Sequence, residues 1–325
     1  MSYEYKFNKE ANRKKMEVYM TEKFWEPAYD DLFSEDIIVD IPTAPPGMPQ
    51  HLDAFDYKQY RGWLTRTCSN VKTEVQEYYG TPDPNVFWGI RDVSADVKWS
   101  KNPGTFSSKI FCRVEFKKGK ISYIKINWNP LHFLYAIHAE VPVFHMDLQD
   151  PRVEAFLKDN PPAEEAKEEE KLDASPEAVA KRIQDNLEAF MRPDYFDALA
   201  TQAVFAPNHE SKVWFLPPEM KESYPAEMMD RVEAWTSLSC PAIDFDESGS
   251  YWATDDPHVY FAEYMCYGKV DWIGNDAPGA HYRNRYFYVI RFDDLGRIAC
   301  CEEVLNPINK FNSIGVSIPT FPYYF

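Results

Sequence analysis

Apolar and polar positions in the first half of the chain follow two successive patterns, helical first and strand-like afterwards. Helical spacing predicts helices from about Asn8, over 25–33 and over 53–70. Strand-like alternation follows near 71–79, 85–98, 105–116 and 119–129. Helices followed by a meander of antiparallel strands are typical of an α+β domain, in which one curved sheet wraps over its helices.

The same order of patterns returns in the second half. Ser175, Pro176 and Glu177 supply an N-cap, a proline at the first helical position and an acid in the first turn, so a helix is predicted from here to Met191. Further helices are predicted over 195–199 and 228–239, and strands near 243–253, 258–271, 281–292 and 297–306. Both halves are therefore predicted to be α+β domains of one kind.

The two halves also match residue by residue in places. Gly296–Phe321 repeats Gly119–Phe144: a turn glycine, a basic residue, an apolar strand, an Asn-Pro pair, a short apolar helix and a Val/Ile-Pro exit, at an offset of 177 (296 − 119). Upstream, Thr254–Phe261 repeats Thr81–Trp88, at an offset of 173 (254 − 81). Because the order is kept and the offset drifts little, the chain is interpreted as a diverged tandem duplication.

The segment between the repeats has a different composition. Asp147 to Ala174 is charged, contains prolines and has few large apolar residues, which is typical of a linker that is helical in part. The predicted division is a first domain over 1–147, an acidic linker over 148–174 and a second domain over 175–325.

The net charge of −17 makes nucleic acids and anionic membranes unfavourable partners. No apolar run is long enough to span a bilayer, and residues 1–15 are too polar for a signal peptide. The six cysteines form no C-x-x-C pair and are interpreted as reduced thiols, which predicts a cytoplasmic protein. Adjacent Cys300 and Cys301 are expected to point to opposite faces of one strand.

Sequence signatures of phosphate, metal and nucleophilic sites are missing. The 12 glycines form neither G-x-G-x-x-G nor a P-loop, and the seven histidines form no H-x-H or H-E-x-x-H group. A G-x-S-x-G nucleophile motif does not occur. The sequence therefore predicts neither a cofactor nor a metal.

A pair of glutamates on the last predicted strand is the main candidate for acid–base chemistry. Strand alternation places Cys301, Glu303 and Leu305 on one face and Glu302 on the other. A carboxyl that faces a concave, aromatic interior is desolvated, and its pKa rises toward the value that a general acid needs at neutral pH. Glu303 is the preferred candidate. The alternative is that both glutamates are solvated or paired with arginines.

Neighbouring positions offer binding groups. Tyr282 and Asn284 share one face of the preceding strand, where Tyr282 either donates to a carbonyl oxygen or fills core, and Asn284 orients a substrate. Arg231 either binds a substrate carboxylate through two hydrogen bonds or pairs with neighbouring acids. Trp235, at the place that matches Trp63 on the third helix, is expected both to line a pocket and to fill core.

The second half carries a series of markers in a fixed order: Thr254–Pro257, Tyr282–Asn284, Phe292–Ile298, Glu303, Asn306-Pro307 and Ile314–Pro319. This series resembles the phenazine-biosynthesis A/B proteins, small members of the SnoaL-like, nuclear-transport-factor-2-like superfamily, and the first half carries it more weakly. The resemblance implies two tandem cones, each with helices closing a curved sheet around a deep apolar pocket without a cofactor. Because that family is ordinarily a single domain that dimerises, two copies imply an intramolecular pseudo-dimer, with further homodimerisation left open.

The resemblance also implies site residues. The family's catalytic acid aligns with Glu303, and its pocket tyrosine aligns with Tyr282 if Leu295 is counted as one extra residue in the turn. A histidine and a serine four residues apart align with Val232 and Thr236. The first half holds Tyr60, Leu64, Phe106 and Ile126 at these four positions. The second pocket is therefore expected to be active and the first to be degenerate.

The leading hypothesis is a cofactor-free enzyme of natural product biosynthesis. It would act by proton transfer on a small aromatic or cyclic molecule with a carbonyl or amine, in a condensation to an imine, a cyclisation, a dehydration or an isomerisation. The predicted catalytic residues are Glu303, Tyr282 and Thr236, and the predicted substrate-binding residues are Asn284, Trp235, Val232, Arg231, Cys301 and Leu305. The alternative is a non-catalytic binding protein or chaperone for a reactive intermediate, since the fold does not decide between them.

Overall fold

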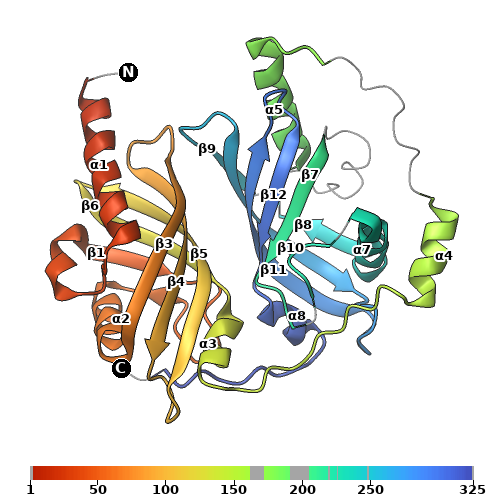
Figure 1. Cartoon of the computed structure of the whole chain (residues 1–325), viewed down its shortest axis with the longest axis horizontal. Helices are drawn as coiled ribbons and strands as arrows, with labels where there is room; N and C mark the ends of the chain where they lie inside the picture. Colours follow the sequence, from red (N-terminus) through yellow and green to blue (C-terminus); the bar gives the residue numbers. More distant parts are fainter. Residues whose placement is uncertain are drawn as a thin grey trace. The chain divides into compact units, whose positions relative to one another are not determined.

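The structure is a computed structural model that describes residues 3–161, 172–190, 205–218, 220–224, 226–246 and 249–323. The chain divides into two compact units, each built around a curved sheet (Figure 1). Unit 1 comprises residues 1–141, 253–256 and 318–325, and unit 2 comprises residues 142–252 and 257–317. The predicted α+β class, with two tandem domains, is confirmed. The division at residues 147 and 175 stays a prediction.

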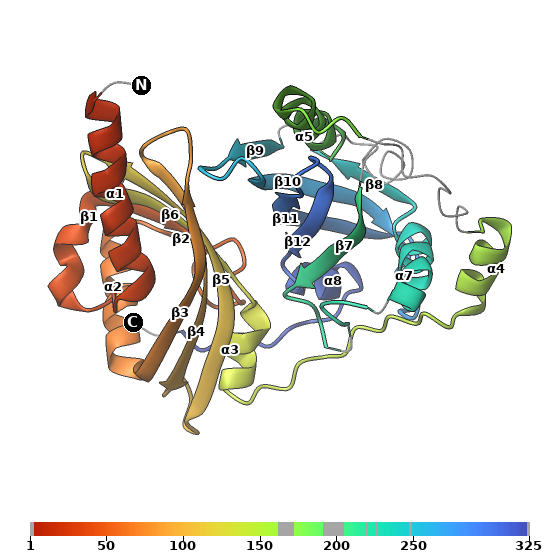
Figure 2. The same cartoon turned by 45° about the horizontal axis from the view of Figure 1, so that its top comes forward.

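Unit 1 is a six-stranded sheet with helices on one face. Its elements are α1 (Tyr3–Thr21), η1 (Pro27–Leu32), β1 (Phe33–Asp40), β2 (His51–Leu52), α2 (Ala54–Thr67), β3 (Cys68–Gly80), β4 (Val86–Val97), β5 (Gly104–Lys117), β6 (Lys120–Trp128) and α3 (Pro130–Ala136). The strand order is β2-β1-β6-β5-β4-β3, and β1 runs parallel to β6 while the other neighbours are antiparallel. Helices α1 and α2 pack against the sheet, as Figure 2 shows.

Unit 2 repeats this arrangement. Its elements are α4 (Pro151–Asp159), α5 (Pro176–Phe190), β7 (Phe205–Trp214), α7 (Ala226–Ser239), β8 (Ala242–Phe245), β9 (Ser250–Ala253), β10 (Val259–Val270), β11 (Ala280–Phe292), β12 (Ile298–Val304) and α8 (Ile308–Ser313). The strand order is β7-β12-β11-β10-β8, with β9 also on β10, and β7 runs parallel to β12. The helix predicted over 195–199 lies outside the described residues.

Strand pairing shows that the duplication extends to register. Cys112 lies opposite Ile126 in unit 1, and Tyr288 lies opposite Glu303 in unit 2. The offsets are 176 (288 − 112) and 177 (303 − 126), so the two strand pairs match once a single extra residue is allowed in the β11–β12 turn. A shift of one residue would turn every side chain to the other face, so the matching register fixes which positions point inward in both units.

The Asn-Pro pair ends the last strand of each sheet and begins a short helix, as the sequence predicted. In unit 1 the side-chain oxygen of Asn129 accepts a hydrogen bond from the backbone N–H of Leu131 at 3.0 Å. In unit 2 that of Asn306 accepts one from the N–H of Ile308 at the same distance. An asparagine cap satisfies a free backbone donor at the start of a helix, and the proline supplies a fitting φ. The site helix α8 is placed in this way.

Part of the predicted linker is folded. Residues 151–159 form α4, which packs against α7, and Val153 on this helix is fully buried. Asp150 caps α4 by accepting a hydrogen bond from the N–H of Arg152 at 2.8 Å. The linker is thus helical in part, as predicted, and residues 162–171 lie outside the described residues.

The exit segment of each repeat contributes an aromatic ring to one of the units. Phe321, near the end of the chain, belongs to unit 1, where it packs edge-on against Trp99 at 5.5 Å and against Phe133 at 5.4 Å between ring centroids. Phe144, the matching residue of the first repeat, belongs to unit 2 and packs edge-on against Trp272 at 5.5 Å. Each ring is at most 1% exposed. The exit segments are therefore part of the two cores.

Candidate functional site

Strand β11 presents a row of tyrosines and one asparagine on one face of the second sheet. Tyr282, Asn284, Tyr286 and Tyr288 alternate along the strand, as predicted for the first two. The Tyr282 and Tyr286 hydroxyls are 3.0 Å apart, within hydrogen-bond distance of each other. Tyr264 on β10 stacks on Tyr288, with ring centroids 5.1 Å apart and planes at 24°. Flat rings and hydroxyls therefore alternate along this face.

Glu303 lies beside this row, on the next strand. The hydroxyl of Tyr288, its cross-strand neighbour, donates a hydrogen bond to Oε2 of Glu303 at 3.0 Å. Burial raises the pKa of the Glu303 carboxyl to about 7, and the Tyr288 hydrogen bond and the charge of Lys310 oppose this rise only in part. A carboxyl with a pKa near neutrality exists in both forms at physiological pH, so it can take up and return a proton.

Glu302 has a different environment on the other face of β12. Its carboxylate forms an ion pair with Arg291 at 3.0 Å and accepts a hydrogen bond from Nε1 of Trp214 at 2.8 Å. This is the paired arrangement that the sequence left open as the alternative reading. Of the two adjacent glutamates, therefore, the structure engages Glu302 in structural pairing and leaves Glu303 among the tyrosines.

Tyr282 and Asn284 are held by hydrogen bonds within the protein. Nδ2 of Asn284 donates to the Tyr282 hydroxyl at 2.8 Å and to the Asn306 carbonyl at 3.0 Å, and its Oδ1 accepts from the Asn306 N–H and from Nδ2 of Asn309. Both amide hydrogens and both acceptor positions of Asn284 are thus in use. Burial raises the pKa of Tyr282 well above its usual value, which keeps the phenol protonated as a donor. Asn284 orients Tyr282.

Lys310 is a buried cation that the sequence analysis did not single out. Its side chain is 5% exposed, and Nζ lies 4.2 Å from the ring centroid of Trp272, 5.7 Å from that of Tyr282 and 5.8 Å from that of Phe144. Contact with aromatic faces stabilises an ammonium ion by up to about 2 kcal/mol. Removing the ion from water costs several kcal/mol. Burial therefore prevails and lowers the pKa of Lys310.

Three thiols lie near the Glu303 carboxyl, and two of them, Cys240 and Cys266, also lie near Lys310. Cys240 follows α7, Cys266 lies on β10, and Cys301 lies two residues before Glu303 on β12. Burial raises the pKa of Cys240 to about 12 and raises those of Cys266 and Cys301 above the usual range. Because the thiolate is the nucleophilic form of cysteine, these thiols are inert lining groups.

Helix α7 carries four of the predicted residues, with mixed outcomes. The Thr236 hydroxyl donates to the Val232 carbonyl at 2.8 Å, a bond within the helix. Trp235 is 2% exposed, stacks on Trp272 at 5.8 Å and donates from Nε1 to the Ile273 carbonyl at 3.2 Å, so it fills core. Leu305, which directly follows β12, is also buried.

Arg231 is engaged elsewhere on α7. It forms an ion pair with Glu154 on α4, and its Nη1 donates to the Leu148 carbonyl at 3.0 Å. The guanidinium therefore ties α4 to α7 and does not join the Glu303 group. Pairing with a neighbouring acid was the alternative reading of this arginine, and we favour it over the binding of a substrate carboxylate.

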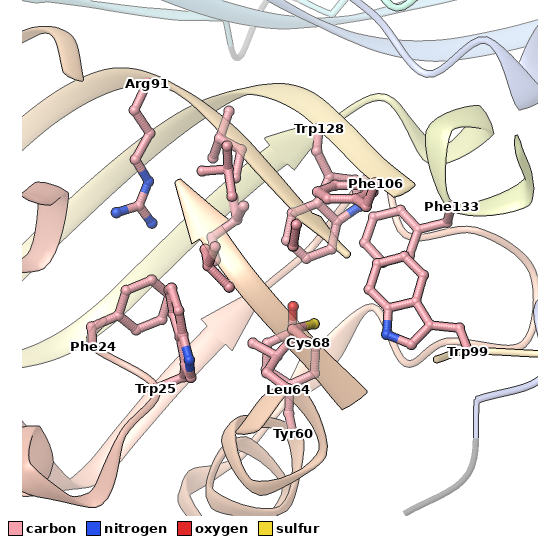
Figure 3. A pocket seen from close by; sticks show the side chains of 15 residues that line it. Phe24, Trp25, Tyr60, Leu64, Cys68, Arg91, Trp99, Phe106, Trp128 and Phe133 are labelled. Atoms are coloured by element: carbon pink, nitrogen blue, oxygen red, sulfur yellow. The ribbon is translucent and has the colours of Figure 1, made fainter. Parts of the chain in front are cut away.

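Unit 1 contains an apolar cavity of about 70 Å³ at the matching place. Its lining includes all four positions that the sequence aligned with the family site: Tyr60, Leu64, Phe106 and Ile126. Figure 3 shows Trp99 and Phe133 side by side at one end of the cavity, and Phe24 and Trp25 at the other. The charged residue of the lining, Arg91, donates to the Tyr19 carbonyl at 2.6 Å and to that of Met20 at 3.2 Å. It thereby caps the end of α1.

Several lining positions of this cavity have counterparts in unit 2 through the internal repeat. Ile126 corresponds to Glu303 and Phe133 to Lys310, both at an offset of 177 (303 − 126 and 310 − 133). Phe106 corresponds to Tyr282 at 176 (282 − 106). Tyr264 and Tyr286 correspond to the lining residues Arg91 and Ile110 at offsets of 173 and 176. Sequence reasoning named Glu303 and Tyr282, and applying the same offsets to the other lining positions would have found the rest.

Three further observations concern the described residues of both units. None of the described helices combines the length and the apolar composition that crossing a membrane requires. Within the described residues, no three His, Cys, Asp or Glu side chains are grouped as ligands for a metal ion. All six cysteines are free thiols.

The chain is similar to solved structures but matches no family model and no curated sequence. Among solved structures, the chain is similar to a phenazine biosynthesis-related protein from Pseudomonas aeruginosa (19% identity, TM-score 0.40), over 44% of this chain and 96% of that one. It is similar to a provisionally assigned isomerase from Bacillus subtilis (19% identity, TM-score 0.36), over 41% and 96% of the two chains.

A third similar structure is a protein with a ketosteroid isomerase-like fold from Catenulispora acidiphila, in complex with trimethylamine. It is 10% identical, with a TM-score of 0.31, and the match covers 39% of this chain and 93% of that one. Each of the three matches covers less than half of this chain. At such identities activity does not transfer, so function has to be argued from the residues of the site.

Proposed function

We propose that the second unit is a cofactor-independent acid–base enzyme of natural product biosynthesis. It acts on a small, planar molecule that carries a carbonyl or an amine, and Glu303 transfers the proton. The observation that carries this proposal is the Glu303 carboxyl, which is desolvated to a pKa of about 7 and oriented by the Tyr288 hydroxyl at 3.0 Å. The reaction is a condensation to an imine, a cyclisation, a dehydration or an isomerisation.

We assign one role to each group. As a carboxylate, Glu303 removes a proton from a carbon or nitrogen next to the carbonyl, and as an acid it returns that proton to another atom of the substrate. The Tyr282–Tyr286 pair supplies one hydroxyl donor for the oxygen on which negative charge develops, because the proton of the other hydroxyl is used in the 3.0 Å bond between them. Burial raises the pKa of both, so they remain protonated. Asn284 positions Tyr282 through the 2.8 Å hydrogen bond.

Aromatic surfaces support a planar substrate. Tyr264, Tyr286 and Tyr288 lie with their ring planes within 24° of one another and with centroids 5.1–6.1 Å apart. Rings arranged in this way offer flat faces to a flat molecule. The hydroxyls of the same residues are at the ring edges, where a substrate's polar atoms need partners.

Unit 1 supports a second candidate function, the binding of a ligand without chemistry. The cavity there is lined mostly by apolar and aromatic side chains, and its counterpart of Glu303 is Ile126. Its phenol, Tyr60, has a pKa that burial raises well above the usual value, so it cannot exchange a proton readily near neutral pH. We therefore propose that unit 1 holds a small apolar molecule or serves as a scaffold in an intramolecular pseudo-dimer.

The test is proton exchange on a defined probe. Acetophenone in heavy water exchanges its methyl protons only if a base removes them, and nuclear magnetic resonance reports the rate with the purified full chain. Glu303→Gln keeps the shape and removes the proton, so the exchange rate should fall by about 10²–10⁴. Ile126→Gln changes the matched position of unit 1 and should leave the rate intact. A Glu303→Gln variant that exchanges at the wild-type rate contradicts the proposal.

A further inference from the structure

We propose that Lys310 is a nucleophilic amine that forms an imine with the carbonyl carbon of a small aromatic aldehyde or ketone, beside Glu303. This inference rests on the proposed function of the second unit and deepens it, because it names the carbonyl as the group attacked and the chain itself as the attacking amine. Lysine side chains react with carbonyls in this way when they are held unprotonated in a desolvated site.

The internal repeat places Lys310 where a side chain faces the interior. Its counterpart Phe133 lines the unit 1 cavity and stacks on Trp99, with centroids 5.0 Å apart and planes at 5°. In unit 2, Nζ of Lys310 lies 4.2 Å from the centroid of Trp272, which is the counterpart of Trp99 at an offset of 173 (272 − 99). Helices α3 and α8 therefore direct Phe133 and Lys310 to equivalent positions in their own units. At this position unit 1 has an aromatic ring and unit 2 has an amine.

Burial around Nζ favours the free amine over the ammonium ion, despite the nearby ring faces. Among the described residues, Lys310 forms no ion pair; the groups whose charge reaches it are Glu303, Cys240 and Cys266, on β12, after α7 and on β10. The thiols are protonated at neutral pH because burial raises both of their pKa values. Desolvation is the largest influence on the amine and lowers its pKa, which increases the fraction present as the free base.

The step needs a proton carrier, and Glu303 supplies one. The nitrogen lone pair of Lys310 attacks the carbonyl carbon, and the carbon–oxygen π pair moves to oxygen. That oxygen takes a proton from the Glu303 carboxyl, relayed by a water, and the nitrogen returns one proton to the Glu303 carboxylate, which gives a carbinolamine. The same carboxyl then protonates the hydroxyl, which leaves as water. The water carries one hydrogen from the nitrogen and one from Glu303, the products are a protonated imine and the Glu303 carboxylate, and no oxidant or reductant is consumed.

An imine with the protein would acidify the carbon next to it. The protonated imine accepts the electron pair of a neighbouring C–H bond more readily than a ketone does, so Glu303 could remove that proton more easily. The amine and the carboxyl thus belong to one sequence of steps, and a reaction that forms a carbon–carbon or carbon–nitrogen bond can follow. The class of substrate that fits is an aromatic or cyclic compound with an unhindered aldehyde or ketone.

Borohydride trapping tests the inference directly. The purified full chain is incubated with benzaldehyde, sodium borohydride is added to reduce any imine to a stable secondary amine, and peptide mapping by mass spectrometry locates the benzyl group. Burial lowers the pKa of Lys310, so a larger fraction of this amine is neutral at a given pH than of an exposed lysine. We therefore expect the benzyl group to form on Lys310 faster than on Lys269, an exposed lysine of β10 in the same unit.

Variants separate this inference from the proposed function. Lys310→Met should remove the adduct, and Lys269→Met should leave labelling of Lys310 unchanged. Glu303→Gln should still label Lys310, because the amine remains, although more slowly. If Lys310 is labelled no faster than Lys269 in the wild-type protein, the inference is overturned even if Glu303 proves essential for exchange. Binding of benzoate that depends on Lys310, without any reduced adduct, would also overturn it and identify Lys310 as a fixed cation.

Discussion

The two units of this protein share the order and pairing of their main strands and have different interiors. In unit 1 the inward positions are Phe106, Ile126 and Phe133, around a cavity of about 70 Å³. In unit 2 their counterparts are Tyr282, Glu303 and Lys310. Three substitutions at positions fixed by the fold thus replace two rings and an aliphatic side chain with a phenol, a carboxyl and an amine.

The interior of unit 2 carries ionisable groups that stability alone would not select. A buried carboxyl and a buried amine each cost free energy of folding unless they are neutral or paired. The apolar set of unit 1 shows that the same scaffold accommodates side chains without this cost. We infer that the ionisable set of unit 2 is kept for chemistry, as is expected where perturbed pKa values cluster.

The largest expected change in stability concerns the exit rings. Phe321 and Phe144 are both buried against tryptophans, Trp99 and Trp272, and a Phe→Ala change in a core costs about 3–5 kcal/mol. Phe321→Ala should destabilise unit 1, and Phe144→Ala should destabilise unit 2. Hydrogen exchange of the backbone amides in the two sheets, measured at increasing denaturant concentration, separates the effects on the two units. Loss of protection in both units from either variant would show that the interiors are not independent.

The second expected effect is a gain in stability from removing Glu303. Folding raises this carboxyl's pKa from 4.5 to about 7, so the unfolded chain releases the proton first and stability falls as pH rises through this window. At about 1.4 kcal/mol per pKa unit, the loss is about 3 kcal/mol above pH 7. Glu303→Gln should therefore be more stable than the wild type by about that amount at pH 8 and nearly equal at pH 4, as measured by urea midpoints. Ile126→Gln, the control, should give a difference that does not change with pH.

A smaller effect is expected from the hydrogen bond to Glu303. The Tyr288 hydroxyl lowers the pKa of Glu303 against the effect of burial, so Tyr288→Phe should raise it further. The midpoint of the exchange rate against pH should move upward from about 7, by up to about one unit, and the rate at pH 7 should fall by up to about tenfold. A midpoint that moves downward would mean that another group controls the profile.

The smallest effect is expected at Thr236. Its hydroxyl hydrogen is bound to the Val232 carbonyl within α7, so it is not available to a substrate. Thr236→Val keeps the shape, and we expect the acetophenone exchange rate to change by less than about threefold, equivalent to about 0.6 kcal/mol. A loss comparable to that of Glu303→Gln would restore Thr236 to the catalytic set that the sequence first suggested.

Much of the fold was available from the sequence because it depends on local patterns. The Asn-Pro pairs at Asn129 and Asn306 stop a strand and cap a helix through bonds to residues two positions away. The hairpin turn at Lys118 and Gly119 has positive φ at both residues, as a tight two-residue connection requires. Alternation along β12 separated Glu302 from Glu303, since successive side chains of a strand point to opposite faces.

Other residues could be assigned only once distant elements were brought together. Arg231 is on the predicted helix, but its partner Glu154 lies 77 positions earlier, on a stretch predicted mainly as linker. Asn284 was expected to orient a substrate, yet its bonds to Asn306 and Asn309 come from a segment more than 20 residues later. No local pattern encodes such partners.

The α+β class and the two tandem domains follow from the sequence, because periodicity, caps and repeat offsets can be counted along the chain. The same alternation along the strand made Glu303 a candidate, and its catalytic role stays a prediction. Only the tertiary structure decided the chemical state of that carboxyl. Its pKa of about 7 arises from burial among β10, β11 and α8, together with the opposing effects of Tyr288 and Lys310. Desolvation depends on all the groups packed around a side chain in space. The sequence could therefore place Glu303 on one face of its strand, but it could predict neither the pKa of this carboxyl nor the position of Lys310 beside Trp272.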